Sequence, residues 1–316
     1  MKLRIVMYHY VRDLAHGRYP GIKGLDYDLF KQQIQFFANR FHVVTMEEVI
    51  AYYNNQYNMP ENAVLLTFDD GYIDHYINVL PVLKEFHMQG SFFVPAKVFA
   101  EHKLLDVNKI HFLLASTPIE VLLPALLEQL DYYRDSKFNY SSNEELFATY
   151  AMANRFDPKE VIFFKRILQT VLPEELRNII TSNLFKKYLD VSEDILAREL
   201  YLNIDQIKQM KREGMYFGIH GYDHYWMNQL NAKKLENDIT KSLESFDTLI
   251  DPGQWVINYP YGSYSDTVVE TVRDRGCVLG LATDVRIADL NKDNCYTLPR
   301  LDTNDFPPKS ENYLKF

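Results

Sequence analysis

Two adjacent aspartates, Asp69 and Asp70, follow an apolar run and precede a glycine in the stretch LLTFDDGY (65–72). Neighbouring carboxylates repel, so this pattern favours either a turn with Gly71 at positive φ or a site that uses both charges. A second stretch, HGYDH (220–224), places His220 and His224 four residues apart, a spacing at which two imidazoles can share one metal ion. One carboxylate and two imidazoles form a three-ligand set with positions open for water, and the second carboxylate is then free to act as a base.

Short β-rich apolar runs alternate with amphipathic helical patterns along much of the chain. The apolar runs predict strands at 3–8, 63–68, 91–95, 215–220, 255–260 and 278–283. Helical patterns follow at 25–40, 72–86, 203–214, 230–250 and 266–276, and Pro81 should kink or restart the second of these. Strand followed by helix, repeated, predicts a parallel sheet with covering helices. At 316 residues this favours a TIM-like (β/α) barrel.

Polar residues stand at the end of five of the predicted strands: His9, Asp69, His220, Tyr261 and Asp284. In a β/α barrel the carboxyl ends of the strands form one rim, where functional groups gather. One such residue is unremarkable, whereas five on the same rim indicate a site.

The alternation stops between about residues 104 and 200, where every pattern is helical. We interpret 1–316 as a single barrel domain with a helical insertion at 104–200. The insertion is either a lid or substrate-selecting wall, or a stabilising or oligomerising appendage, because amphipathic faces suit both.

The amino-acid composition limits the classes of molecule that the protein is expected to bind. With 34 basic and 43 acidic residues the net charge is −9, which argues against nucleic-acid binding and favours an uncharged or amphipathic substrate. Two cysteines exclude a disulfide framework. The N-terminal stretch reaches charged residues too early for a secretory signal, and no apolar run is long enough to span a membrane. We therefore expect a cytoplasmic protein, either free in the cytoplasm or bound peripherally at the inner membrane face. The sequence does not indicate the oligomeric state.

Three stretches resemble the motifs of polysaccharide deacetylases with the NodB homology domain (carbohydrate esterase family 4). TFDDG (67–71) matches the first motif letter for letter. HGYDH (220–224) is similar to the second, H-[ST]-x-x-H, with Gly221 in place of the hydroxyl residue. NYPYGSY (258–264) is similar to the third, with Asn258 where the family has arginine. The resemblance covers roughly 1–100 and 200–300 and implies a distorted NodB-type barrel of about seven strands.

The resemblance implies a metal-dependent N-deacetylase that acts on a polysaccharide, an amino sugar or a glycan precursor, in surface-polysaccharide biosynthesis. In family terms Asp69 is the general base, and the backbone N–H of Tyr261 stabilises the oxyanion. Asp70, His220 and His224 bind one divalent metal, first of all Zn²⁺, with Co²⁺, Ni²⁺ or Mn²⁺ as alternatives. The rival functions are a deformylase or O-acetyl esterase on sugars, and an inactive carbohydrate-binding homologue.

The family's C-terminal acid histidine is absent, because no histidine follows His224. However, MYHYV (7–11) resembles the start of a circularly permuted branch that deacetylates poly-N-acetylglucosamine, where a histidine after the first strand supplies the acid. The resemblance thus assigns the general acid to His9.

Four further residues are candidates for substrate contact or support: Arg300, Asp284, Tyr222 and Asn258. Arg300 either replaces the missing third-motif arginine by pairing with Asp69, or contacts a sugar or phosphate. Asp284 either orients His9 or caps a turn. Tyr222 either stacks on a sugar ring or packs in the core.

Overall fold

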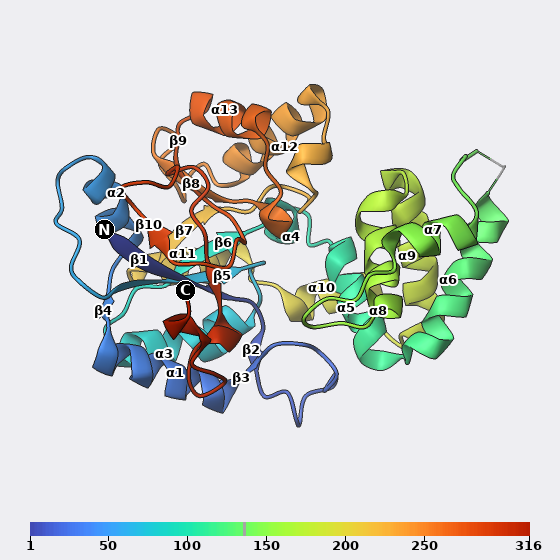
Figure 1. Cartoon of the computed structure of the whole chain (residues 1–316), viewed down its shortest axis with the longest axis horizontal. Coiled ribbons are helices and arrows are strands. Elements are labelled where there is room, and N and C mark those ends of the chain that lie inside the picture. The colour runs from blue at the N-terminus through green and yellow to red at the C-terminus, as the bar shows by residue number, and fades with distance from the viewer. Residues whose placement is uncertain (135–136) are drawn as a thin grey trace. The chain divides into compact units, whose positions relative to one another are not determined.

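Residue contacts divide the chain into two units. The computed structural model describes residues 1–134 and 137–316. The first unit contains Met1–Asp13, Gly24–Lys103 and Ala197–Phe316, and the second contains Leu14–Lys23 and Leu104–Leu196. Figure 1 shows the strands within the first unit, whereas the second is helical. The second unit takes in most of the helical stretch 104–200 and also residues 14–23, which no sequence pattern linked to it.

A curled, mostly parallel sheet forms the centre of the first unit. Its seven-strand main path, as far as the structure describes the chain, runs in the order β10–β1–β5–β6–β7–β8–β9. All neighbours on this path are parallel except β1 and β10. The strands are β1 (Lys2–Tyr8), β2 (Val11–Arg12), β3 (Leu25–Asp26), β4 (His42–Val43), β5 (Ala63–Asp69), β6 (Ser91–Val94), β7 (Tyr216–Ile219), β8 (Trp255–Asn258), β9 (Cys277–Leu281), β10 (Ala288–Asp289) and β11 (Leu301–Asp302). This winding confirms the predicted distorted (β/α) barrel.

Segment 298–302 links the two sides of the sheet. Leu298 pairs with Leu281 at the end of β9, and Leu301 in β11 pairs with Val6 in β1. Arg300 lies between these two pairings, so the segment carries its side chain into the barrel, where it is 1% exposed. The two-residue strand β11 is too short to leave a sequence pattern, and it was not predicted.

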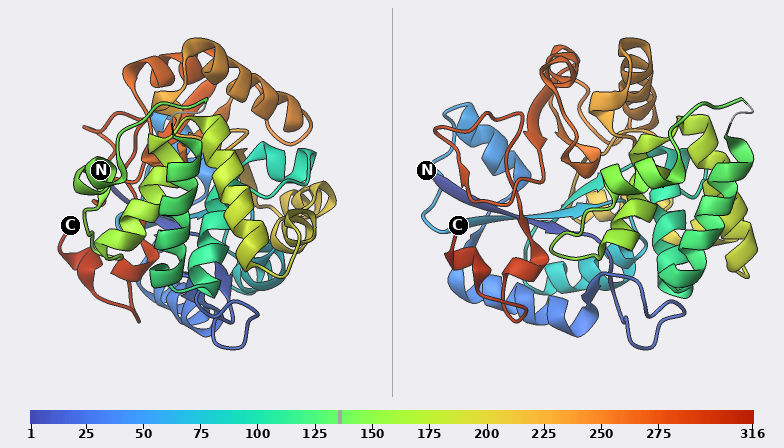
Figure 2. Two further views of the ribbon diagram at one scale, coloured as in Figure 1. Left: turned by 90° about the vertical axis from the view of Figure 1, so that its right-hand side faces the viewer. Right: turned by 45° about the vertical axis from the view of Figure 1, so that its right-hand side comes forward.

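Helices cover the strands of the first unit. In Figures 1 and 2, α1 and α3 lie on one side and α12 and α13 on the other. The predicted helix 72–86 is a π-helical turn, η1 (His75–Val79), followed by α3 with Pro81 in its first turn, which is the predicted restart. The helices are α1 (Tyr27–Arg40), α2 (Met46–Tyr53), α3 (Leu80–Glu85), α4 (Ala96–Ala100), α11 (Ile204–Arg212), α12 (Ala232–Ser245) and α13 (Asp266–Asp274).

An aromatic ladder crosses four adjacent strands on one face of the sheet. Ring centroids lie 4.9, 4.8 and 5.6 Å apart along the series Tyr8, Phe68, Phe92 and Phe217. Because successive side chains of a strand point to opposite faces, Thr67 and Asp69 point away from this ladder. The ladder therefore fixes which face of β5 carries the carboxylate.

The second unit is a set of packed helices. They are α5 (Asp106–Ser116), α6 (Ile119–Tyr133), α7 (Asn143–Tyr150), α8 (Lys159–Arg166), the π-helical turn η2 (Ile167–Val171) and α9 (Glu174–Tyr188), while α10 (Glu193–Leu200) runs from this unit into the first. Contacts join α5 to α6 and α9, and α6 to α8 and α9; Figure 2 shows them side by side. Among the described residues, no helix has both the length and the hydrophobicity to cross a bilayer.

Candidate active site

Polar residues at the strand ends gather at one end of the barrel. Asp69 is the last residue of β5, and Asn258 is the last of β8. His220 directly follows β7, and His9 directly follows β1. The carboxyl ends of parallel strands meet at one rim, so residues far apart in the sequence become neighbours.

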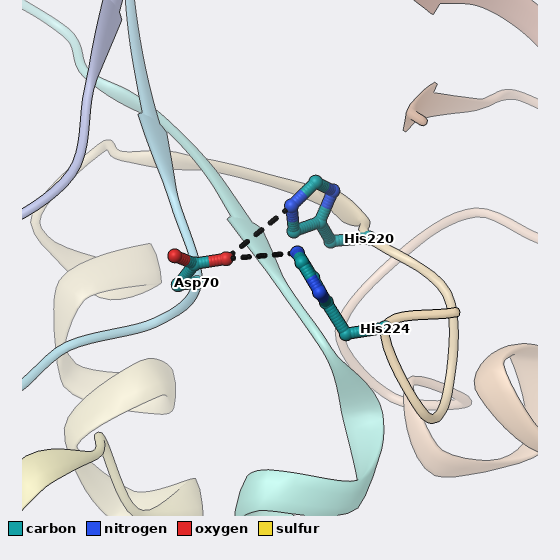
Figure 3. A group of neighbouring side chains, drawn as sticks. All are labelled: Asp70, His220 and His224. Atoms are coloured by element: carbon teal, nitrogen blue, oxygen red, sulfur yellow. Dashed lines mark ion pairs between the residues drawn. The ribbon is translucent and has the colours of Figure 1, made fainter. Parts of the chain in front are cut away.

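The side chains of Asp70, His220 and His224 converge on one point (Figure 3). Oδ1 of Asp70 lies 3.4 Å from Nε2 of His220 and 3.2 Å from Nε2 of His224. The three candidate ligand atoms all lie within 4.8 Å of one another, and all three residues are buried. No other such group of three or more metal-ligating side chains was found among the described residues.

The arrangement fits a divalent cation. Nδ1 of His220 lies 2.6 Å from the carbonyl oxygen of Asn258, so Nδ1 carries the proton and donates it. In a neutral ring of this tautomer the lone pair of Nε2 faces Oδ1 of Asp70, and a cation between the two atoms would turn this repulsive contact into a favourable one. Two ligand atoms about 2.0–2.1 Å from a tetrahedral zinc ion lie about 3.3 Å apart, close to the observed separations.

Two pKa shifts show how strongly the groups of the cluster interact. Burial acts to raise the pKa of Asp70, but the imidazoles of His220 and His224, acting as hydrogen-bond donors, outweigh burial and hold that pKa well below its usual range; a cation at this point would act in the same direction. Burial lowers the pKa of His224 more than Asp70 raises it, so the neutral form, which binds metals, is favoured. Nδ1 of His224 is buried without a hydrogen-bond partner in the described part of the chain.

Tyr72 holds the second oxygen of Asp70. Its hydroxyl donates to Oδ2 at 2.6 Å, and its side chain is fully buried. Asp70 itself has a φ of 72°, which breaks the strand's alternation directly after Asp69. With Oδ2 occupied by Tyr72, only Oδ1 faces the two histidines. Tyr72 was not predicted, although a tyrosine two residues after a candidate ligand is a visible signal.

Replacing Tyr72 with Phe should weaken metal binding. The variant leaves Asp70 in place but frees one carboxylate oxygen, and loss of such a supporting hydrogen bond typically costs about 10- to 100-fold in affinity. Calorimetric titration of the metal-free protein with Zn²⁺ measures the effect. Tyr76→Phe, on the next turn, is the matched control, and equal affinities for the two variants would show that Tyr72 does not orient the ligand.

Arg300 holds Asp69. Its guanidinium donates to Oδ1 of Asp69 at 2.9 Å and approaches Oδ2 at 2.9 Å, a bidentate pair. The remaining donors reach Oδ1 of Asn258 at 2.9 Å and the carbonyl of Ala282 at 2.8 Å. Burial acts to raise the pKa of Asp69, but Arg300 above all outweighs it, and the pKa is lowered. Of the two roles considered for Arg300, the geometry fits pairing with Asp69, because its side chain contacts protein groups and not solvent.

His9 lies on the open side of Asp69. Its Nε2 is 3.8 Å from Oδ2 of Asp69, and its side chain is 40% exposed. Asp284, considered as a partner for His9, is exposed, and its backbone carbonyl accepts from the N–H of Arg300 at 3.0 Å. Among the described residues, the carboxylate found within 4 Å of the His9 ring is that of Asp69.

A buried aspartate from α12 supports the loop between the two histidines. Asp238 accepts from the backbone N–H of Tyr222 at 2.9 Å and of Asp223 at 3.2 Å. Gly221 has a φ of 69°, and a Cβ there would lie 3.2 Å from Asp238 Oδ1. This contact explains glycine at the position where the second motif has a hydroxyl residue.

Asp238 was not predicted, although a charged residue beside Leu235 and Ile239 on the apolar face of a helix is a signal.

Two other predicted site residues, Tyr222 and Tyr261, differ in what their side chains contact. Tyr222 points its hydroxyl to Glu101 and is 7% exposed. Tyr261 has a φ of 59°, and its ring packs 4.7 Å from His224 and stacks on Trp226 at 4.8 Å. Tyr261 thus lies beside the histidine pair, and Tyr222 turns away toward α4.

Comparison with known proteins identifies the protein family to which the chain is similar. The family model described as "Polysaccharide deacetylase" matches residues 56–129 and 180–279, more than half of the chain. The Bacillus subtilis protein YxkH, provisionally named a polysaccharide deacetylase, is 24% identical over 106 residues, which are 34% of this chain and 38% of that protein. The chain therefore spans well under half of that relative.

Solved structures share the fold over the whole length. The deacetylase PplD of Streptococcus pyogenes, solved in complex with acetate, is 19% identical with a TM-score of 0.60, over 100% of this chain and 97% of that one. A de-N-acetylase of Aggregatibacter actinomycetemcomitans is 16% identical with a TM-score of 0.58, over 99% and 100%. At these identities the likeness is one of fold.

Proposed function

The chain belongs to the polysaccharide deacetylase family, and from this premise we propose that it is a metal-dependent hydrolase that removes N-acetyl groups from an amino-sugar glycan or glycan precursor of surface-polysaccharide synthesis. One observation carries the proposal: Asp70, His220 and His224 converge in a buried cluster, and Arg300 holds a second carboxylate, Asp69, beside them. The similar fold of the de-N-acetylase from Aggregatibacter actinomycetemcomitans supports the acetyl amide as the bond that is cleaved.

Asp70, His220 and His224 are the residues that would hold the metal. A divalent cation there would polarise the acetyl carbonyl and lower the pKa of water. Two imidazoles and one carboxylate are a typical donor set of catalytic zinc sites, so Zn²⁺ is our first assignment. The same donors accept Co²⁺, Ni²⁺ and Mn²⁺.

Asp69 is the proposed general base. Arg300 lowers the pKa of Asp69, so the carboxylate is ionised at neutral pH and able to accept a proton from the attacking water. The same pair fixes the carboxylate in one orientation, since both oxygens face the guanidinium. We propose that Arg300 thereby replaces the arginine of the third family motif, for which this chain has Asn258.

His9 and Tyr261 are the proposed partners of the leaving amine and the oxyanion. His9 is partly exposed beside Asp69, a position from which an imidazolium can protonate the amine as the C–N bond breaks. The backbone N–H of Tyr261 would stabilise the oxyanion, a donor typically worth about 3–4 kcal/mol. Water adds to the carbonyl carbon and the amine leaves with a proton, so the products are acetate and a free amino sugar.

A panel of acylated sugars tests the reaction class. We expect acetate release from N-acetylglucosamine oligomers or N-acetylated sugar precursors, measured by an enzymatic acetate assay. Faster release of formate from N-formyl sugars, or of acetate from O-acetyl sugars, would instead favour the deformylase or esterase. Ligand binding without release of either acid would favour an inactive carbohydrate-binding homologue.

A further inference from the structure

The backbone that carries His9 lies beyond the sheet. Strand β1 ends at Tyr8, and the next strand, β2, pairs over two residues only. Backbone outside a ladder needs other hydrogen-bond partners to be held in one place. Segment 9–12 makes some contacts with β3, among them the bond from the N–H of Leu25 to the carbonyl of Tyr10, and receives its other partners from segment 72–78, which follows the two aspartates after Gly71.

Three side chains of segment 72–78 bind the backbone of segment 9–12. Nε2 of His75 donates to the carbonyl of His9 at 3.0 Å. Oδ2 of Asp74 accepts from the N–H of Val11 at 3.1 Å. Nδ2 of Asn78 donates to the carbonyl of Val11 at 2.8 Å. Three consecutive peptide groups, 9–10, 10–11 and 11–12, therefore each make one hydrogen bond with a side chain of segment 72–78.

Contacts between side chains also join segment 9–12 to segment 72–78. The guanidinium of Arg12 pairs with both oxygens of Asp74 at 2.7 Å. The rings of Tyr10 and Tyr72 stack with centroids 3.9 Å apart. Tyr72 also binds Asp70, so one rigid contact set connects the segment of His9 to the cluster of Asp70, His220 and His224.

The π-helical turn makes these contacts possible. In η1, His75 and Val79 are buried, whereas Ile77 is 56% exposed. A π-helical turn shifts the faces of the residues that it carries and is frequent at functional sites. Here Asp74, His75 and Asn78 all face segment 9–12. His75 is fully buried, and burial lowers its pKa, which keeps the ring neutral, with Nε2 as the donor.

We propose that Asp74, His75 and Asn78 are positioning residues for His9, so that segment 69–78 carries the base and a metal ligand and also fixes the general acid. The inference rests on the proposed function, because it needs His9 to protonate the leaving amine. General acids act only within hydrogen-bond reach of the leaving atom, and displacements of about 1 Å can cost about 100-fold in rate.

Two substrates separate acid catalysis from general damage. An N-acetylglucosamine oligomer has a basic amine leaving group that must be protonated, whereas 4-nitrophenyl acetate has a leaving group that departs without a proton. His9→Ala sets the reference pattern: a large loss of kcat on the amide, little loss on the ester and unchanged metal content. If His9→Ala spares amide turnover, the acid assignment fails and the positioning proposal fails with it.

The positioning variants should reproduce this pattern in weaker form. Asn78→Leu and His75→Leu each remove one donor, and we expect at least about a tenfold loss of kcat on the amide, less than about twofold on the ester, and unchanged zinc content. His75→Gln, which keeps a donor near the place of Nε2, should recover most of the loss. Ile77→Ala, on the exposed side of the same turn, is the matched control and should not change either rate.

Combination with His9→Ala decides the outcome. Added to His9→Ala, Asn78→Leu should cause no further loss of amide turnover, because the group that it positions is gone. If His9→Ala shows the selective pattern but Asn78→Leu and His75→Leu lower both rates equally, or neither, the positioning proposal is wrong and the proposed function stands.

Discussion

The Asp69→Asn variant is expected to hydrolyse an N-acetylated amino sugar about 100 to 10,000 times more slowly than the wild type, the usual contribution of a general base. Asparagine keeps the size of the side chain and one acceptor for Arg300, but it cannot take a proton from water. Asp69 is the neighbour of the Asp70, His220 and His224 cluster and not a member of it. Metal content should therefore be unchanged.

Acetate release and metal analysis on the same preparation check this expectation. Asp251→Asn, at an exposed position, is the matched control and should keep the wild-type rate. Acetate release at the wild-type rate by Asp69→Asn, with metal retained, would remove Asp69 from the mechanism. Loss of metal from the variant would instead make Asp69 part of the metal site.

Replacing Arg300 with Met should lower the free energy of unfolding by about 3–5 kcal/mol, because it leaves a buried carboxylate without its partner. Arg300 and Asp69 are 1% and 2% exposed at their side chains. Urea unfolding at pH 7 measures the change. Arg286→Met removes an exposed arginine that pairs with Asp293, and this control should cost at most about 1 kcal/mol. A similar small cost for Arg300→Met would contradict the pairing.

Arg300→Met should also change two pH dependences. Arg300 is the main group that lowers the pKa of Asp69 against burial, so without it that pKa rises. A base must be ionised, and the acidic limb of the kcat/KM profile should therefore move to higher pH. In the wild type the lowered pKa stabilises the fold above the ordinary value of 3.8, and this contribution is lost as pH falls through the folded pKa. The stability difference between wild type and variant should accordingly shrink as the pH falls from the raised pKa of Asp69 in the variant to its lowered pKa in the wild type.

The strands and the residues of the Asp70, His220 and His224 cluster could be predicted from the sequence because both depend on local patterns. Continuous apolar runs mark buried parallel strands, and β5, with every residue buried, is the clearest case. The motifs that contain Asp70 and His220 lie at strand ends. A barrel brings these strand ends together regardless of the length of the loops between the strands. The helix boundaries were less accurate: the predicted helix 25–40 begins at Tyr27, because Asp26 caps it and Leu25 joins β3.

The parts that were missed depend on contacts between distant segments. Two roles stayed open for Arg300, since the pairing with Asp69 joins residues 231 positions apart and follows from the closing segment 298–302. Asp238 and Asn78 form hydrogen bonds with backbone groups. Every residue has such groups, so the sequence contains no particular residue type that would reveal these partners. The association of residues 14–23 with the helical unit likewise has no pattern that could have predicted it.

The central claim is that the Asp70, His220 and His224 cluster holds a metal required for amide hydrolysis. Its most direct test is metal analysis of the purified protein, combined with acetate release from an N-acetylglucosamine oligomer before chelation, after it and after return of Zn²⁺. We predict about one equivalent of divalent metal per chain, loss of acetate release on chelation and recovery with Zn²⁺. Acetate release that continues at the same rate in the metal-free protein would contradict the account.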